Sequence, residues 1–366
     1  MAAPTVAPTN PTSVAAVPST QPSSTALPVV VVPTGVPTSA TTAAPATTAT
    51  PTIITTNGGR PALARGALTK RPLMAMIDNH PDAYPQTGLD EAALVFEALA
   101  EYGVTRYMAI YAPEIKPVEG NIGPIRSARL YFVQWAMGFQ AVYTHAGGSP
   151  AGLERLTSDD NTLVIDIDLV TLEDRGIFDY SRRDRNRLAP HNLYSSQPEI
   201  ERYVADRAAA SADADVSEVG YLFAADNPAL GRANPVNRLR YYFLYPEAFV
   251  RWTYDSTTNQ YFRFRGQTPH IDAVSGEQLS FKSVTVMEVQ EAPIAGDPKG
   301  RIDQVVISEG SALVFANGTQ IAATWRKDSE IGPLRFYDQQ DAEIVFPAGP
   351  IWVAAVPSLS NVTTSE

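Results

Sequence analysis

The chain has 366 residues, a formal net charge of −11 and no cysteine. An acidic chain without a run of Lys or Arg lacks the basic surface that displaces counterions from nucleic-acid phosphates, and it is poorly suited to docking on anionic lipid. The absence of cysteine excludes disulfides, thiolate nucleophiles and zinc sites built on Cys.

Residues 1–59 differ in composition from the rest of the chain. They contain no charged residue and no histidine, and they consist almost entirely of Pro, Thr, Ser, Ala and Val. Frequent prolines block helices and sheets, and small side chains form no core that would offset the loss of chain entropy. We therefore predict a disordered stalk, of a kind that commonly tethers exported domains, with a tail of no particular role as the alternative.

Order is predicted to begin near Arg71. Residues 71–77 form an apolar run that is typical of a buried strand. Residues 89–102 show apolar side chains at helical spacing, and Gly103 follows as a natural helix stop, so this segment predicts a helix. The next strand is expected at residues 105–111, and the resulting β-loop-α-β order predicts a parallel or mixed sheet.

The alternation of helices and strands continues to about residue 225. Further helices are expected at residues 127–138, 150–156 and 197–211, and further strands at residues 141–144 and 163–167. The length of the chain also favours two domains over one. We therefore predict an α/β domain with a mixed sheet over residues 60–225.

The pattern changes to strands and tight turns in the last third of the chain. Strands are expected at residues 249–254, 260–264, 312–315, 320–325, 342–346 and 351–355. The dipeptide Asn317-Gly318 favours a type I′ hairpin turn between two of them. Residues 226–366 are therefore predicted to form a second, mainly β domain.

Polar side chains follow several of the predicted strands of the first domain. Ligands bind at the carboxyl ends of the strands in open α/β sheets, so we expect these loops to meet at one rim. The candidate ligand-binding residues are Asp78, Asn79, His80, Arg126, Ser127, Arg129, His145, Gly147, Gly148, Ser149, Arg182, His191 and Asn192.

Two of these arginines lie at the predicted start of a helix. Backbone N–H groups at a helix N-terminus, together with the planar guanidinium of Arg126, suit a carboxylate or phosphate. Arg126 and Arg129 are expected on the same helix face. The alternative is that an arginine pairs with Asp78, Glu97 or Asp166 inside the fold.

The glycine-rich loop after His145 allows two interpretations. It could form a ligand cradle that opens a helix, or Ser149 could act as a nucleophile served by His145 or His191 and oriented by Asp78 or Asp166. No Gly-x-Ser-x-Gly elbow is present, so a helix-capping role for Ser149 is favoured.

The spacing of the four histidines does not indicate a metal site. The sequence contains no His-x-x-x-His pair, no His-Glu-x-x-His motif and no EF-hand loop. We therefore predict neither a metal nor another cofactor, and we assign no catalytic residue.

Several unusual blocks resemble those of a known family. Met76–Pro81, Pro85–Leu89, Thr105–Tyr107, Gly123–Arg129 and His145–Pro150 closely resemble signature blocks of the N-terminal domain of the YerB-like lipoprotein family, DUF3048. The segments from Trp252–Asp255 through Thr324–Trp325 to Ile351–Val353 resemble its C-terminal domain. The resemblance implies an extracytoplasmic lipoprotein, but it implies no activity and no catalytic residues. The 366 residues show no export signal and no lipobox cysteine, so a tether to membrane or wall is inferred from the stalk and the resemblance.

Three functional hypotheses remain open. The first is a protein that binds an anionic small molecule or cell-envelope component through the Arg/His/Asp rim. The second is a scaffold that presents a surface to a protein partner. The third is a hydrolase or transferase that uses a rim histidine as general base, so whether the protein is an enzyme stays open. No nucleic-acid partner is expected, and contact with the membrane is expected only through the tether.

Overall fold

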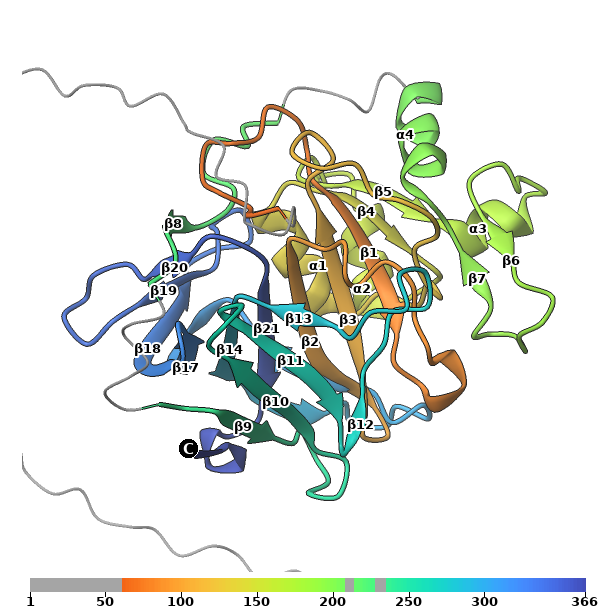
Figure 1. The fold of residues 1–366 in the computed structure, drawn as a ribbon. Helices are drawn as coiled ribbons and strands as arrows, with labels where there is room; N and C mark the ends of the chain where they lie inside the picture. The colour runs from red at the N-terminus through yellow and green to blue at the C-terminus, as the bar shows by residue number, and fades with distance from the viewer. Residues whose placement is uncertain (1–60, 208–213, 228–234) are drawn as a thin grey trace, which may run out of the picture. The chain divides into compact units, whose positions relative to one another are not determined.

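The computed structural model describes residues 61–207, 214–227 and 235–366 (Figure 1). These residues all belong to one compact unit. The stalk predicted over residues 1–59 lies outside the described residues. Among the described helices, none is long and apolar enough to cross a membrane.

A ten-stranded mixed sheet organises the described chain. Its strands, in spatial order, are β19 (Arg335–Tyr337), β18 (Thr319–Lys327), β17 (Ser308–Ala316), β14 (Ser283–Glu288), β21 (Ile351–Val356), β2 (Leu94–Glu101), β3 (Val104–Tyr111), β1 (Leu73–Asp78), β4 (Val142–His145) and β5 (Ile165–Asp168). The pairs β14–β21, β21–β2, β1–β4 and β4–β5 are parallel, and the other pairs are antiparallel. Strands from both sides of residue 225 meet in this sheet where β21 pairs with β2.

A second sheet packs on one face of the first. It runs in the order β12 (Thr268–Pro269), β11 (Gln260–Arg265), β10 (Val250–Asp255), β9 (Arg238–Tyr241) and β22 (Thr363–Ser365), and β13 (Ser280–Phe281) also pairs with β11. Figure 1 shows β9 to β11 in front of β14, β21 and β2, and the buried side chains of both sheets form one apolar cluster. Short ladders join β15 (Gln290–Pro293) to β16 (Ile302–Val305), β8 (Leu222–Ala224) to β20 (Val345–Pro347), and β6 (Arg182–Arg183) to β7 (Leu193–Tyr194).

Helices cover the large sheet on both faces. The helices are α1 (Leu130–Gly138), α2 (Pro150–Thr157), α3 (Leu169–Asp174) and α4 (Gln197–Asp206). Phe96 of β2 stacks on Trp135 of α1 with ring centroids 4.7 Å apart on one face. Trp352 of β21 meets Trp252 of the second sheet at 5.4 Å on the other. The predicted class, mixed α/β followed by mainly β structure, is confirmed.

The helix predicted over residues 89–102 is wrong, because the segment contains strand β2. Seven of the eight residues of β2 are buried, so the strand shows none of the polar alternation that would have marked it. Gly103 is no helix stop: Tyr102 and Gly103 have φ of 51° and 80°, as the two central residues of a type I′ hairpin turn require. Glu97 lies in the middle of this strand and is buried.

The buried Glu97 forms an ion pair with Arg263 between the two sheets. Arg263 Nη2 lies 2.9 and 2.8 Å from the two carboxylate oxygens of Glu97, and both side chains are inaccessible to solvent. Thr105 Oγ1 and Trp352 Nε1 also donate to this carboxylate, at 2.9 and 3.1 Å. The guanidinium of Arg263 lies 4.5 Å from the ring centroid of Trp352. The pair therefore has the extra hydrogen bonds that a desolvated pair needs.

We expect Arg263→Leu to lower the free energy of unfolding by about 3–5 kcal/mol, because it leaves the Glu97 charge buried without its counter-ion. Arg326→Leu is the matched control, since Arg326 pairs with the exposed Glu309 and Asp341. The control should change stability little. Urea unfolding of both variants measures the difference, and an equal effect of the two substitutions would contradict the assignment.

Candidate functional site

The carboxyl ends of three neighbouring parallel strands lie at one edge of the large sheet. Asp78 ends β1, His145 ends β4 and Asp168 ends β5. The segment of residues 122–128 runs along the end of β1: Asp78 N donates to Pro124 O at 2.9 Å, and Arg126 N donates to Met76 O at 2.8 Å. The parallel pairing of these strands therefore places several candidate residues at the same edge of the sheet.

The segment of residues 122–128 also connects this edge to two other loops. Ile125 N donates to Leu193 O at 2.6 Å, which brings the loop of His191 alongside. Ala128 N donates to Gly147 O at 2.9 Å, which brings the glycine-rich loop alongside. Backbone pairing, rather than side-chain contact, therefore sets the positions of the loops.

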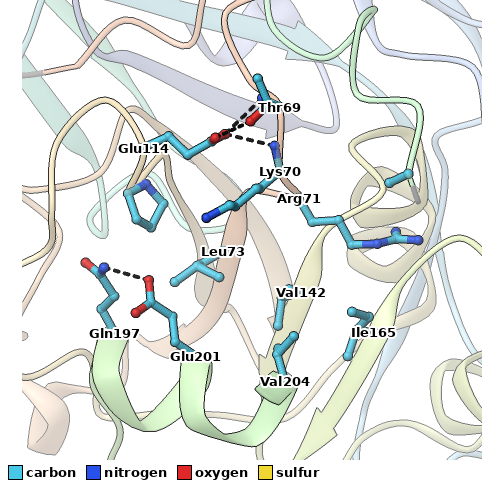
Figure 2. A pocket seen from close by; sticks show the side chains of 12 residues that line it. Thr69, Lys70, Arg71, Leu73, Glu114, Val142, Ile165, Gln197, Glu201 and Val204 are labelled. Atoms are coloured by element: carbon cyan, nitrogen blue, oxygen red, sulfur yellow. Dashed lines mark hydrogen bonds between the residues drawn. The ribbon is translucent and has the colours of Figure 1, made fainter. Parts of the chain in front are cut away.

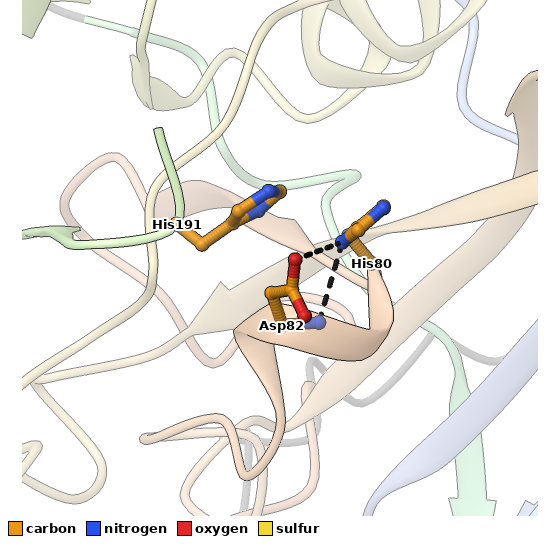
Figure 3. A group of neighbouring side chains, drawn as sticks. All are labelled: His80, Asp82 and His191. Atoms are coloured by element: carbon orange, nitrogen blue, oxygen red, sulfur yellow. Dashed lines mark hydrogen bonds and ion pairs between the residues drawn. The ribbon is translucent and has the colours of Figure 1, made fainter. Parts of the chain in front are cut away.

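Four candidate residues form one cluster, which we call the His80 cluster: Asp78, His80, Arg126 and His191. His191 Nδ1 lies 2.6 Å from Asp78 Oδ2, and Arg126 Nε lies 3.2 Å from the same oxygen. The rings of His80 and His191 stack with centroids 4.4 Å apart and planes inclined by 14°. His80 Nδ1 accepts a hydrogen bond from Asp82 N at 3.2 Å (Figure 3). The alternative in which an arginine pairs with Asp78 is therefore present in the structure.

The His80 cluster keeps unused polar atoms near solvent. The side chains of His80 and Arg126 are 41% and 24% exposed, whereas that of Asp78 is 2% exposed. Among the described residues, no hydrogen-bond partner is found for Nε2 of His80, Nε2 of His191 or the two Nη atoms of Arg126. The cluster therefore presents guanidinium and imidazole nitrogens to a ligand, and the carboxylate beneath them holds their positions.

The expected anion site at a helix N-terminus is not formed. Helix α1 begins at Leu130, so Arg126 and Ser127 precede it and share no helix face with Arg129, which is the N-cap. Arg129 is buried, donates to Ala128 O at 2.7 Å and pairs with Glu101. The Ser127 carbonyl accepts a hydrogen bond from Arg106 at 3.0 Å. The half-buried Glu101 pairs with both Arg106 and Arg129, and this group draws Arg129 into the fold and away from the expected site.

His145 belongs to a separate buried group. Its Nε2 lies 2.7 Å from Asp166 Oδ1 and its Nδ1 lies 2.8 Å from Gly147 O. Gly147 N donates to Asp168 Oδ1 at 2.7 Å. Both ring nitrogens face acceptors, so both must carry protons. Burial acts to lower the pKa of His145, but Asp166, Asp168 and the Gly147 carbonyl outweigh it and raise the pKa above its ordinary value.

Ser149 caps helix α2, since its Oγ accepts a hydrogen bond from Gly152 N at 3.2 Å. Its hydroxyl is engaged there and His145 is bonded elsewhere, so the arrangement is not that of a Ser–His pair. A Cβ at Gly148 would lie 2.9 Å from the side chain of Leu153, which explains the need for a small residue. This loop is a structural support beside the His80 cluster.

The remaining candidates hold the loops in place. Arg182 Nη1 pairs with Glu199 at 2.7 Å. Asn192 Nδ2 donates to Arg187 O at 3.2 Å. Asn79 Nδ2 donates to Thr105 Oγ1 at 2.6 Å.

Sequence reasoning missed two residues that touch the cluster. Asp82 lies only two residues after His80, and this short spacing could have indicated that Asp82 belongs near the cluster. Gln86 is fully buried and donates from Nε2 to Asp78 O at 2.9 Å. Its Oε1 lies 2.9 Å from His270 Nε2 in the second half of the chain, and no sequence pattern indicates that contact.

His80, Asp82 and His191 also form a group that could hold a metal ion, with ligand atoms within 4.8 Å of one another (Figure 3). A metal ion lies close to the plane of each imidazole that binds it. The two rings are stacked and nearly parallel, so no single ion can lie in both planes unless a ring rotates. The arrangement fits a flat or charged guest better than a preformed tetrahedral metal site.

A hollow of about 570 Å³ lies at the opposite edge of the sheet, by the amino ends of β1, β4 and β5 (Figure 2). Leu73, Val142, Ile165 and Val204 form its apolar part. Its polar groups are largely engaged: Glu114 accepts from the backbone of residues 69–70 at 2.9 and 2.8 Å, and Gln197 donates to Glu201 at 2.7 Å. The hollow therefore offers a ligand fewer available polar groups than the His80 cluster does.

Comparisons with known proteins agree with the resemblance seen in the sequence. Residues 58–211 match the model described as "Protein of unknown function (DUF3048) N-terminal domain", and residues 239–353 match the corresponding C-terminal domain. The Bacillus subtilis (strain 168) protein called "Putative lipoprotein YerB" is 28% identical over 310 residues, which are 81% of this chain and 84% of that protein. The crystal structure of YerB from Bacillus subtilis matches with a TM-score of 0.68 and 26% identity, over 81% of this chain and 94% of that one.

Because the pKa of His145 is raised in the folded state, we expect its contribution to stability to be complete below about pH 6.5 and to be lost as the pH rises through the folded value. His145→Gln and Asp166→Asn should both flatten the fall in unfolding free energy that begins above about pH 6.5. Urea unfolding over a series of rising pH values measures the slopes. Slopes equal to that of the unmodified protein in both variants would contradict the charged state of His145.

Proposed function

Because the chain belongs to the DUF3048 family, which brings no assigned activity, we propose a function from the geometry: the protein binds an anionic group at the His80 cluster. The observation that carries the proposal is Arg126. Its Nε lies 3.2 Å from Asp78 Oδ2, its two Nη atoms have no partner among the described residues, and its side chain is 24% exposed. A planar guanidinium in this state suits the two oxygens of a carboxylate or phosphate.

The histidines support the same proposal. Asp78 accepts from His191 Nδ1 and so fixes the orientation of its ring, which leaves Nε2 for a ligand. The stacked ring of His80 places a second free Nε2 beside it. The guanidinium of Arg126 and the Nε2–H of His80 can present donors to an anion without a rearrangement of the backbone, and His191 adds a third donor when its ring is doubly protonated.

The ligand is proposed to come from the cell envelope. The relative from Bacillus subtilis is named as a lipoprotein, and we extend to this chain an extracytoplasmic location with a tether. The Pro/Thr-rich composition of residues 1–59 supports a tether. A protein held there would meet uronic acids, phosphorylated polymers and peptide carboxylates.

Arg126→Gln should weaken binding of the responsive anion by about tenfold or more, because a hydrogen bond to a charged group contributes about 1.5–3 kcal/mol. Calorimetric titration with inorganic phosphate, glucuronate and muropeptides measures the loss. Arg175→Gln is the matched control, since it removes one exposed positive charge elsewhere on the surface.

His80→Gln complements this experiment, because His80 is 41% exposed and its loss should weaken binding with little change in thermal stability. If no anion binds to the unmodified protein, or if both variants bind as well as the control, the His80 cluster serves only to lock the fold. That outcome would favour a scaffold without a ligand.

A second candidate function rests on the buried Asp78–His191 pair. A carboxylate that holds an imidazole by Nδ1 prepares Nε2 to act as general base. If the protein is a hydrolase, His191→Gln should abolish turnover of a chromogenic phosphoester or carboxyl ester while anion binding through Arg126 survives. The absence of turnover on either substrate class in the unmodified protein counts against this candidate.

A further inference from the structure

Three arginines line up on the outer face of the second sheet. Arg238 and Arg240 are exposed residues of β9, and Arg251 of β10 lies directly opposite Arg240 in the strand register. Like charges directly opposite each other on a sheet repel, so the pairing of Arg240 with Arg251 is itself destabilising. Within the described ranges, none of the three forms an ion pair with a carboxylate, in a chain whose net charge is −11.

Aromatic rings hold two of these guanidinium groups in place. Arg240 lies over Phe249 and Arg251 lies over Phe264, each with its guanidinium carbon 3.8 Å from the ring centroid. Stacking orients the guanidinium planes and leaves their N–H edges available to a ligand. Arg240 donates one hydrogen bond to Pro246 O at 3.1 Å, and Arg251 Nε is buried without a partner.

The arginines border a hollow of about 210 Å³, which we call the arginine hollow. Its lining is completed by donors and one ring, without a carboxylate side chain: Phe249, Gln267, Thr363, Thr364 and Ser365. Guanidinium, amide and hydroxyl groups around a small depression are the set that recognises a phosphate group. The three hydroxyl residues come from edge strand β22 and are exposed.

We propose that the arginine hollow binds the phosphate group of an anionic ligand, independently of the His80 cluster. The two sites share no residue, so the failure of one leaves the other intact. The phosphate group could be carried by a soluble molecule or by a lipid headgroup. Either kind of ligand can reach the outer face of the sheet, and the experiment below distinguishes between the two.

The test uses the full chain with Arg126→Gln/His80→Gln as background, so that any binding at the His80 cluster is weakened. Calorimetric titration with inorganic phosphate is expected to show a site that weakens by about tenfold or more in Arg240→Gln/Arg251→Gln. The matched control Arg175→Gln/Arg202→Gln removes the same charge elsewhere and should retain binding. Removal of the like-charge pair should not lower the unfolding temperature greatly.

Thr363→Glu is the second variant, because Thr363 is exposed and lies directly opposite Arg240 on the same face of the sheet. The added carboxylate should abolish binding although no arginine is substituted. Flotation with phosphatidylglycerol vesicles, against phosphatidylcholine vesicles, forms the lipid arm. Binding to anionic vesicles alone assigns a headgroup, and binding to phosphate in solution assigns a soluble ligand. The proposal is overturned if neither probe binds, or if the arginine variants and Thr363→Glu bind like the control.

Discussion

The ion pair of Glu97 and Arg263 constrains the structure because both charges lie where no water can reach them. A carboxylate in that position must keep all its donors, and these come from both sheets: Arg263 of β11, Thr105 of β3 and Trp352 of β21. The second sheet can therefore pack on the first only in the register that completes this set. The apolar cluster around the ion pair provides the buried surface between the two sheets, and the ion pair restricts the sheets to one arrangement.

The same pair supports the candidate site from beneath. Arg263 Nη1 lies 2.5 Å from His270 Nδ1, and His270 Nε2 lies 2.9 Å from Gln86 Oε1. Burial and the positive charges of Arg263 and Arg265 keep the pKa of His270 well below its usual value, so this histidine is neutral and its tautomer is fixed. Gln86 must then turn its amide nitrogen to the carbonyl of Asp78. The loop of the His80 cluster is thus held by a chain of hydrogen bonds that begins in the interior.

The sequence predicted the strands at β1, β3, β10, β11 and β17–β18 well, because each shows a clear apolar or alternating pattern between turn residues. It failed at β2, where burial on both faces leaves no period to distinguish a strand from a helix. Local spacing also indicated that Asp78, His80 and His191 follow strands or lie in loops. It could not indicate which arginine stays near solvent, because Arg126 and Arg129 differ only through the distant Glu101. Contacts between residues that are distant in the sequence leave no signal in the local sequence pattern.

The position of β21 has a consequence for how the chain is made. Residues 351–356 lie between β14 and β2 in space, yet they are synthesised long after β2. Until they emerge from the ribosome, one edge of β2 has no strand to pair with. An unpaired strand whose side chains are apolar can associate with other chains. The first two thirds of the molecule therefore cannot complete its sheet early.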